Sequence, residues 1–213
     1  MVEHYYSEKQ TSPFNKKKIS FVFKNKKFTF YTAPGVFSKT RVDPGTRFLL
    51  ENMIINDSWR VLDLGCGYGV VGIVIKKLFP NTNVVMSDVN ERALKLARLN
   101  AKLNNVSVET IKSDSFNNIN GFFNAILINP PQAAGLKICY KLIIDSEKHL
   151  LNNGLLELVA RPKKGGSRFE QKLLEVFGNV ETIRGKTYWV YVSKKLDKTK
   201  GLVRKIMDNI VST

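Results

Sequence analysis

Apolar and polar residues alternate strictly near the start of the chain. The segments 19–24 (ISFVFK) and 27–32 (KFTFYT) follow a period of two on either side of residues 25–26. This period places every second side chain on one face of a strand, so it predicts a β-hairpin with one buried face. Asp43 and Pro44 then predict a short helix to about residue 53, because Asp is a favourable N-cap and Pro is tolerated at the first helical position.

From residue 60 onward, short apolar runs alternate with segments of helical period. Strands are expected at 60–65, 83–88, 106–111, 124–129 and 155–160, and helices near 69–79, 91–103, 135–150 and 167–177. Such an alternation is typical of a parallel sheet covered on both faces. The last two runs, 179–184 and 187–194, are joined by a short turn and must be antiparallel. The pattern therefore predicts an α/β protein with a doubly wound, mostly parallel sheet that ends in an antiparallel hairpin.

The length of 213 residues favours one main domain with appendages. We expect a basic arm at 1–18, the main domain at 19–196 and a basic C-terminal helix at 197–213. In the last segment, Leu202, Ile206 and Ile210 recur at helical spacing. Packing against the core is the preferred interpretation of this helix, and an RNA-contacting helix is the alternative.

Charge narrows the classes of partner. The chain has 34 Lys and Arg against 18 Asp and Glu, a formal charge of +16, which suggests a polyanion such as nucleic acid, although a solvated basic surface is the alternative. Two cysteines, Cys66 and Cys139, have no metal-ligand spacing, so a reduced cytoplasmic protein without a metal site is expected. Membrane-spanning runs and a signal-peptide pattern are not found in the sequence.

The segment VLDLGCGYGVVGI, residues 61–73, follows a strand and opens a helix. Its glycines, Gly65, Gly67 and Gly69, permit a tight turn and close approach of a ligand, which is either a dinucleotide or an adenosyl amino acid. A carboxylate at Asp63 would repel a pyrophosphate but suits a positive amino group.

Two more acids end the next strands along the chain. Asp88 lies about 25 residues beyond Asp63, where an acid can accept hydrogen bonds from a ribose, and Asp114 lies where it can accept one from an adenine amino group. Each acid taken singly is also explained as a helix or turn cap. Together they border one crevice, because the carboxyl ends of parallel strands meet at one edge of the sheet.

These motifs, together with NPPQ at 129–132, resemble those of class I S-adenosylmethionine-dependent methyltransferases. With PGVFSKTRVDPGTRFLLENM at 34–53, the chain is similar to the small methyltransferase domain of the bacterial ribosomal RNA guanine-N2 methyltransferases and their archaeal single-domain relatives. The resemblance covers residues 20–195 and implies a Rossmann-like seven-stranded sheet with a cofactor lid. It also implies an S-adenosyl-L-methionine site formed by Phe37, Asp63, Gly65, Gly67, Tyr68, Gly69, Asp88, Asn90, Asp114, Ser115 and Asn129.

The NPPQ segment supplies the expected catalytic group, Asn129, Pro130, Pro131 and Gln132. Methyl transfer to an exocyclic amine needs the nitrogen lone pair aimed at the methyl group, and two acceptors, the Asn129 side-chain oxygen and the Pro130 carbonyl, can bind its two N–H groups. Many amino methyltransferases that resemble this chain have a stacking aromatic after the prolines. Here it is Gln132, which we expect to hydrogen-bond a base edge instead.

Basic residues gather near both ends of the chain and are expected to bind RNA phosphates, at Lys16, Lys17, Lys18, Lys163 and Lys164. The sequence therefore predicts an N-methyltransferase acting on guanine N2, with ribosomal RNA first and transfer RNA as a possibility. The alternatives are a protein glutamine N5 or DNA adenine N6 methyltransferase, and a non-catalytic RNA-binding factor that retains the fold.

Overall fold

The computed structural model describes residues 12–197, with the exception of the Lys164 side chain. The predicted N-terminal hairpin is present as β1 (Lys17–Phe23) and β2 (Lys26–Thr32). Its turn lies at Lys24 and Asn25, one residue earlier than expected, and both have positive φ, as a two-residue type I′ turn requires. Four phenylalanines alternate onto the buried face: Phe21, Phe23, Phe28 and Phe30.

The expected boundary of the N-terminal arm needs correction. Lys17 and Lys18 pair with Thr32 and Tyr31 in the hairpin, so they belong to β1 and not to an irregular arm. Residues 12–16 of the expected arm form no helix or strand, and residues 1–11 lie outside the described residues, as does most of the expected C-terminal helix, from residue 198.

The main sheet has seven strands in the order β5-β4-β3-β6-β7-β9-β8. The first five are parallel to one another, β9 is antiparallel to both β7 and β8, and the predicted fold is thereby confirmed. The strands are β3 (Arg60–Leu64), β4 (Asn83–Asp88), β5 (Glu109–Lys112), β6 (Phe123–Ile128), β7 (Leu150–Ala160), β8 (Glu181–Arg184) and β9 (Trp189–Lys194).

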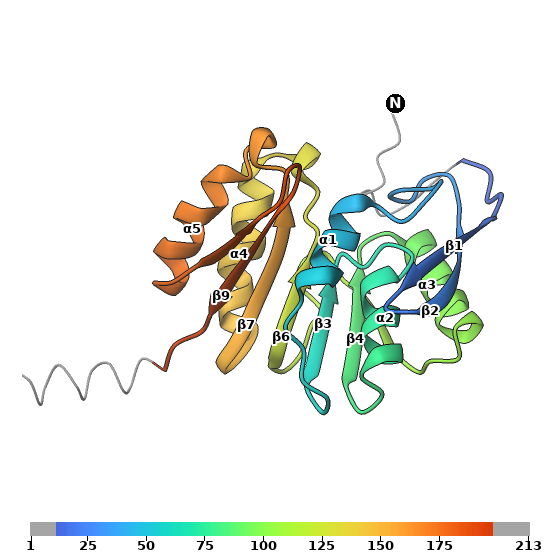
Figure 1. Cartoon of the computed structure of the whole chain (residues 1–213), viewed down its shortest axis with the longest axis horizontal. Helices are drawn as coiled ribbons and strands as arrows, with labels where there is room; N and C mark the ends of the chain where they lie inside the picture. The colour runs from blue at the N-terminus through green and yellow to red at the C-terminus, as the bar shows by residue number, and fades with distance from the viewer. Residues whose placement is uncertain (1–11, 198–213) are drawn as a thin grey trace, which may run out of the picture.

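Helices cover both faces of this sheet (Figure 1). One apolar cluster joins α1, α2, α3 and the N-terminal hairpin to the sheet, and a second joins α4 and α5 to the other face. The helices are α1 (Pro44–Asn52), α2 (Val70–Leu78), α3 (Glu91–Leu103), α4 (Leu136–His149) and α5 (Ser167–Phe177), with two short 3₁₀ turns, η1 (Gln132–Ala134) and η2 (Pro162–Lys164).

Two strands begin three or more residues away from the expected position, and the other strand boundaries of the main sheet lie within two residues of it. Strand β5 begins three residues late, because the N–H groups of Asn105 and Val106 bond back to Lys102 and Ala101 and close the end of α3 in a Schellman motif. Strand β7 begins at Leu150 instead of 155, because its first residues pair with β6 before a register shift. Local backbone bonding, which the hydrophobic pattern does not show, decides both positions.

The hairpin is attached to the main domain by two asparagine side chains of α3. Asn100 accepts from the N–H of Tyr31 and donates to its carbonyl, at 2.6 and 2.9 Å, and Asn104 makes the same pair of bonds with Thr29, at 3.1 and 2.8 Å. The two amides thus act as a short strand beside the edge of β2 and satisfy its unpaired backbone groups. Asn100 also donates to the carbonyl of Tyr68 in the glycine loop, at 2.9 Å.

Candidate functional site

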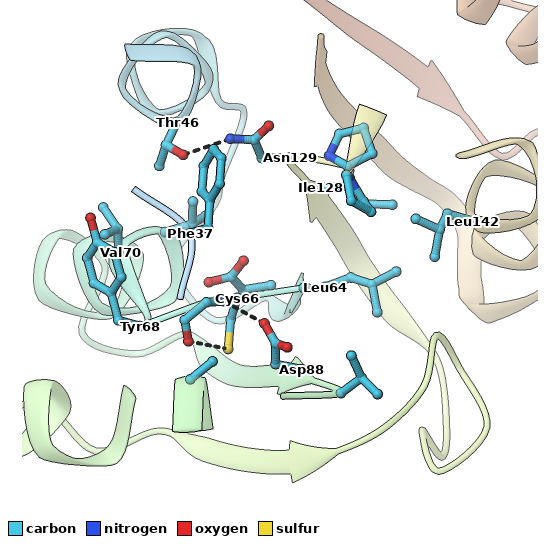
Figure 2. Close-up of a pocket in the computed structure, with 18 of the residues that line it drawn as sticks. Phe37, Thr46, Leu64, Cys66, Tyr68, Val70, Asp88, Ile128, Asn129 and Leu142 are labelled. Carbon is cyan, nitrogen blue, oxygen red and sulfur yellow. Dashed lines mark hydrogen bonds between the residues drawn. The ribbon is translucent and has the colours of Figure 1, made fainter. Parts of the chain in front are cut away.

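A cavity opens at the carboxyl ends of β3, β4 and β6, where the sequence places its glycine loop, acids and NPPQ segment (Figure 2). Of the predicted cofactor residues, those that line it are Phe37, Asp63, Gly65, Gly67, Tyr68, Asp88, Asp114, Ser115 and Asn129, and Pro130 and Pro131 line it as well. One concave site therefore gathers residues from most of the chain, as expected for an open α/β sheet.

The glycine loop leaves room for a ligand against its backbone. Gly65 and Gly67 have φ of +72° and +56°, and a Cβ on either would meet nothing within 4 Å. A side chain at these positions would be strained and would occupy the space that a ligand needs. Gly69 does not line the cavity: it is the left-handed N-cap of α2 and packs against Ile73 and Met86.

Asp63 is a buried acid with a structural hydrogen bond. Its carboxylate accepts the N–H of Gly72 in the first turn of α2, at 2.8 Å. Burial, followed by repulsion from Asp88, raises the pKa of Asp63 to about 7, although the Gly72 bond opposes this shift. Asp63 lines the cavity, and the same carboxylate also anchors a helix.

Asp88 braces the glycine loop from the end of β4. One oxygen accepts the N–H of Gly67 and the other accepts the N–H of Asn90, both at 2.8 Å. Burial raises the pKa of Asp88, and its backbone hydrogen bonds oppose the shift. In residues 12–197, no basic side chain forms an ion pair with Asp63 or Asp88, so these two of the cavity's acids have no cation beside them.

Asn90 is not in the cavity, although it was expected to hold a ribose. It is fully buried as the N-cap of α3, where its side-chain oxygen accepts from Arg92 and Ala93 and its amide nitrogen donates to the carbonyl of Gly35. A capping residue uses its side-chain oxygen to bond the first N–H groups of the helix. For this reason Asn90 does not line the cavity with the other predicted cofactor residues.

The remaining predicted cofactor residues border the cavity from three sides. Asp114 is exposed beyond β5, and Ser115 beside it has a positive φ of 53°. Tyr68 is buried against Phe30 and its hydroxyl lies 3.4 Å from the carbonyl of Ser38. Phe37 comes from the segment before α1, and Figure 2 shows it between the Asn129 side and the glycine-loop side of the cavity.

The Asn129 side chain is held by the first turn of α1. Its amide nitrogen donates to the Thr46 hydroxyl at 2.9 Å and to an Asp43 carboxylate oxygen at 3.2 Å. A carboxylate only accepts hydrogen bonds, so it must face the NH₂ end of the amide. The side-chain oxygen of Asn129 then lies away from Thr46, as Figure 2 shows, and keeps its lone pairs for another donor.

Sequence reasoning found Asp43 only as a helix cap and did not identify Thr46 as a site residue. Asp43 does cap α1, by accepting the N–H of Thr46 at 2.9 Å. Both side chains also line the cavity. They lie more than 80 residues before Asn129 in the sequence, so no local pattern links them to it.

The backbone after Asn129 turns sharply. Pro131 has φ −73° and ψ 76°, and the Pro130 carbonyl accepts the N–H of Gln132 at 2.8 Å across this inverse γ-turn. One lone pair of the carbonyl is therefore used within the chain and one is left.

Gln132 was expected to hydrogen-bond a base edge, but its side chain does not line the cavity. Its oxygen accepts the N–H of Arg161 at 2.8 Å and its nitrogen donates to the Arg161 carbonyl at 3.2 Å, so it ties the NPPQ segment to the residue beyond β7. Lys163 is exposed in the following 3₁₀ turn, on this rim, and the side chain of Lys164 lies outside the described part of the structure. Lys16, Lys17 and Lys18 are exposed on the N-terminal hairpin.

None of the helices in residues 12–197 is both long and apolar enough to cross a membrane. Over the same residues, no group of His, Cys, Asp and Glu side chains is arranged to hold a metal ion.

Comparison with protein families places the site in context. The sequence profile named Methyltransferase small domain matches residues 27–192. The chain is 39% identical over 201 residues to the uncharacterized protein YbxB of Bacillus subtilis, which covers 92% of this chain and 100% of that protein. It is 40% identical over 136 residues to ribosomal RNA small subunit methyltransferase C of Haemophilus influenzae, which covers 62% of this chain but only 41% of that enzyme.

Solved structures show the same Rossmann-like fold. The T. thermophilus 16S rRNA N2 G1207 methyltransferase RsmC, in complex with AdoMet and guanosine, has a TM-score of 0.78 at 25% identity, over 86% of this chain and 51% of that one. A methyltransferase from Pyrococcus furiosus shares the fold at 21% identity, with a TM-score of 0.63 over 71% of this chain and 82% of that one. The chain thus spans about half the length of the enzyme RsmC that it resembles.

Proposed function

The chain belongs to the Methyltransferase small domain family, and we propose that it transfers a methyl group from S-adenosylmethionine to the exocyclic amino group of a guanine in RNA. The observation that carries the proposal is the fixed orientation of Asn129, whose amide nitrogen is held by Asp43 and Thr46 and whose oxygen is left to accept from an amine. An amide oxygen set in this way can accept a hydrogen bond from the N–H of the amine that is to be methylated.

The residues of the cavity fit S-adenosylmethionine. Asp63 is buried and Asp88 is half-buried, neither acid has an ion-pair partner in the described chain, and a ligand with a positive amino group would supply the missing cation. The open space beside Gly65 and Gly67 admits a ligand against the loop backbone. Asp63 would hold the ammonium group, Asp88 the ribose, and Asp114 with Ser115 the adenine.

When bound, S-adenosylmethionine supplies a methyl group on a positive sulfonium: the nitrogen–carbon bond forms as the sulfur–carbon bond breaks with its electron pair going to sulfur, and the nitrogen releases a proton to solvent. The chain contributes by orientation. Asn129 and the remaining lone pair of the Pro130 carbonyl accept the two N–H groups of the amine, which directs the nitrogen lone pair toward the methyl group. No strong base is needed, because positioning and the local field supply most of the rate.

RNA as the acceptor is supported by charge and by the relatives. The net charge of +16 favours a polyanionic substrate, and Lys163 and the hairpin lysines are exposed. The H. influenzae and T. thermophilus relatives are named as ribosomal RNA methyltransferases, and the latter as acting on N2 of a guanine. We infer that ribosomal RNA is the first substrate to test.

The test is transfer of labelled methyl groups to deproteinised ribosomal RNA, transfer RNA, DNA and protein fractions from cells lacking this gene, followed by nucleoside identification. We expect N2-methylguanosine in the ribosomal RNA fraction. If label appears only in DNA or protein, the substrate is not RNA and the proposal is wrong. If no fraction is labelled, a non-catalytic factor is favoured.

The Asn129→Ala variant tests the mechanism in the same assay. It should lower turnover by roughly 100-fold or more while S-adenosylhomocysteine affinity stays within a few-fold, since an acceptor that orients the amine is lost. Asn120→Ala, which changes an exposed asparagine outside the cavity lining, is the matched control and should retain full activity. Turnover near wild type in Asn129→Ala would rule out the positioning role.

A further inference from the structure

A planar cation, Arg161, lies beside the NPPQ segment. Arg161 is the first residue beyond β7, and both of its backbone polar groups bond to the Gln132 side chain. The residue that follows the two prolines, where the related amino methyltransferases often have an aromatic side chain, therefore holds an arginine in place. Residue 132 has no aromatic ring that could stack on a base, and its side chain anchors Arg161 instead.

The Arg161 guanidinium is hydrogen-bonded through one edge to Tyr188, in the turn between β8 and β9. Nε and Nη2 donate to the phenol oxygen at 2.9 and 2.5 Å, and the guanidinium carbon is 5.0 Å from the centroid of the ring. These bonds, with the nearby charge of Asp43 as a weaker cause, raise the pKa of Arg161. Arg161 is thus a permanent cation whose plane is set by two hydrogen bonds to one phenol.

Tyr188 in turn rests on the helix turn that orients Asn129. A Cβ added to Gly45 would come within 2.8 Å of two ring carbons of Tyr188, so the ring packs directly on the backbone of α1. Thr46 and Asp43, which hold the Asn129 amide, flank Gly45 in the same turn. Arg161, Tyr188 and Asn129 are therefore carried by one rigid unit.

The hydrogen bonds of Arg161 that the described residues make do not use its faces or its Nη1 end. The Nε–Nη2 edge, one of two edges that can bind a phosphate in bidentate fashion, is already used by the Tyr188 phenol. The residue as a whole is exposed. A planar group can stack on the exposed guanidinium, and unstacked RNA bases bind to arginine planes in this way.

We propose that Arg161, held through its backbone by Gln132 and fixed in its plane by the Tyr188 phenol, is the stacking surface for the RNA base that enters the site. This inference rests on the proposed function and names a subsite of it. The guanidinium plane takes the place of the aromatic residue that position 132 lacks.

The decisive comparison is between Arg161→Ala and Arg161→Lys, because lysine keeps the charge and loses the plane. We expect both variants to weaken binding of single-stranded, guanine-containing RNA oligonucleotides and to raise KM for RNA by about 5- to 100-fold, the range seen when a base stack is removed. The affinity for S-adenosylhomocysteine and the melting temperature should not change. In Arg161→Lys, the salt dependence of RNA binding should stay as in wild type.

Arg168→Ala and Arg168→Lys are matched controls, since Arg168 is an exposed arginine of α5 and has no ring partner among the described residues. If Arg161→Lys binds and methylates RNA like wild type, Arg161 is a charge contact and the stacking inference is wrong. If the wild type methylates RNA and both Arg161 variants match it, the stacking inference alone fails. A wild type that neither binds nor methylates RNA would overturn the proposed function together with this subsite.

Discussion

The orientation of Asn129 depends on two acceptors that a single helix turn supplies. Asp43 serves two donors with one carboxylate oxygen, the N–H of Thr46 and the amide of Asn129. The Thr46 hydroxyl takes the other amide hydrogen, and Thr46 is buried. At the scale of single residues, a helix cap thus doubles as the group that decides which end of an amide faces the substrate.

Replacing Asp43 separates these two roles. Asp43→Ser keeps an N-cap, but its oxygen is one bond shorter and withdraws from Asn129, so turnover should fall roughly 10-fold while the melting temperature and S-adenosylhomocysteine affinity stay close to wild type. Asp43→Asn offers a carbonyl oxygen at the same reach and should restore most of the turnover. Steady-state kinetics and thermal unfolding of the two variants check this prediction.

An equal loss of stability and turnover in Asp43→Ser would assign Asp43 a purely structural role. Thr46→Val, which replaces the hydroxyl by a methyl group of similar size, provides an independent check and should lower turnover without affecting cofactor affinity.

Asp63 predicts a pH dependence for cofactor binding. With the pKa of Asp63 at about 7, the acid is mostly protonated at pH 6 and cannot attract an ammonium group. The affinity for S-adenosylhomocysteine should therefore be roughly 10-fold lower at pH 6 than at its maximum, and should fall again above about pH 8 as the ligand's own amine loses its proton. Calorimetry at intervals of half a pH unit measures both limbs.

Asp63→Asn is the variant for this test, because the amide oxygen can still accept the N–H of Gly72 and keep α2 in place. It should bind more weakly and lose the acid limb. If the affinity of Asp63→Asn for S-adenosylhomocysteine still falls at low pH as in wild type, the titrating group is not Asp63. Asp88, whose pKa is also raised by burial, would then be the acid responsible.

At the scale of elements, α1 is held at both ends. Its first turn bonds to Asn129, and just beyond its last turn the N–H of Ile54 donates to both carboxylate oxygens of Glu157, at 3.2 and 3.1 Å. Glu157 is fully buried in β7, and burial raises its pKa to about 8 against the opposing Ile54 bond. A helix that carries Asp43 and Thr46 is thus fixed to two strands of the sheet.

Glu157 predicts how stability changes with pH. Its pKa is higher in the folded protein than the ordinary value of 4.5, so the folded state binds more protons between these values. The stabilisation is full below about pH 4.5 and is lost as pH rises through 8. Glu157→Gln, which can still accept from Ile54, should therefore gain roughly 2 to 4 kcal/mol over wild type between pH 5 and pH 8.5.

Urea unfolding at both pH values measures this difference, and Glu109→Gln, an exposed acid of β5, is the matched control. The slope due to Asp63 is common to all three proteins and cancels. A difference between Glu157→Gln and wild type that does not change with pH would show that Glu157 does not titrate in this range.

At the scale of the whole molecule, the positive net charge should make the affinity for RNA fall as the salt concentration rises. The exposed Lys163 lies on the rim beside Gln132. Lys163→Ala should reduce the slope of log affinity against log salt by about 0.7 for single-stranded RNA, with no change in cofactor binding. The Lys16, Lys17 and Lys18 triple alanine variant should reduce it further if the hairpin belongs to the same surface.

Lys102 and Lys148 provide the control, because they lie in the last turns of α3 and α4, away from the carboxyl ends of the strands. Their double alanine variant removes two charges and should leave the slope as in wild type. Equal slopes for all variants would mean that RNA contacts other basic residues.

Patterns confined to neighbouring residues were predictable from the sequence. In residues 12–197, the apolar runs and helical periods locate α1 to α5 and the strands of the main sheet within a few residues, and the sequence also identifies Asp43 as a cap. The glycine loop and the acids that follow were placed at one edge of the sheet, because parallel strands bring their carboxyl ends together. Asn90 was misassigned, since a capping asparagine and a ligand-binding one look alike in sequence.

The sequence by itself therefore determined the layers, the sheet and the edge on which the site lies, because burial of apolar surface follows a local period that each segment carries within it. Only the tertiary structure decided which groups the polar side chains hydrogen-bond to. Asn129 meets the first turn of α1, Asn100 meets β2, and Gln132 meets Arg161 across separations of 29 to 86 residues. An amide can bond to any backbone or side-chain group in reach, so its partner is fixed by packing and has no signature along the chain.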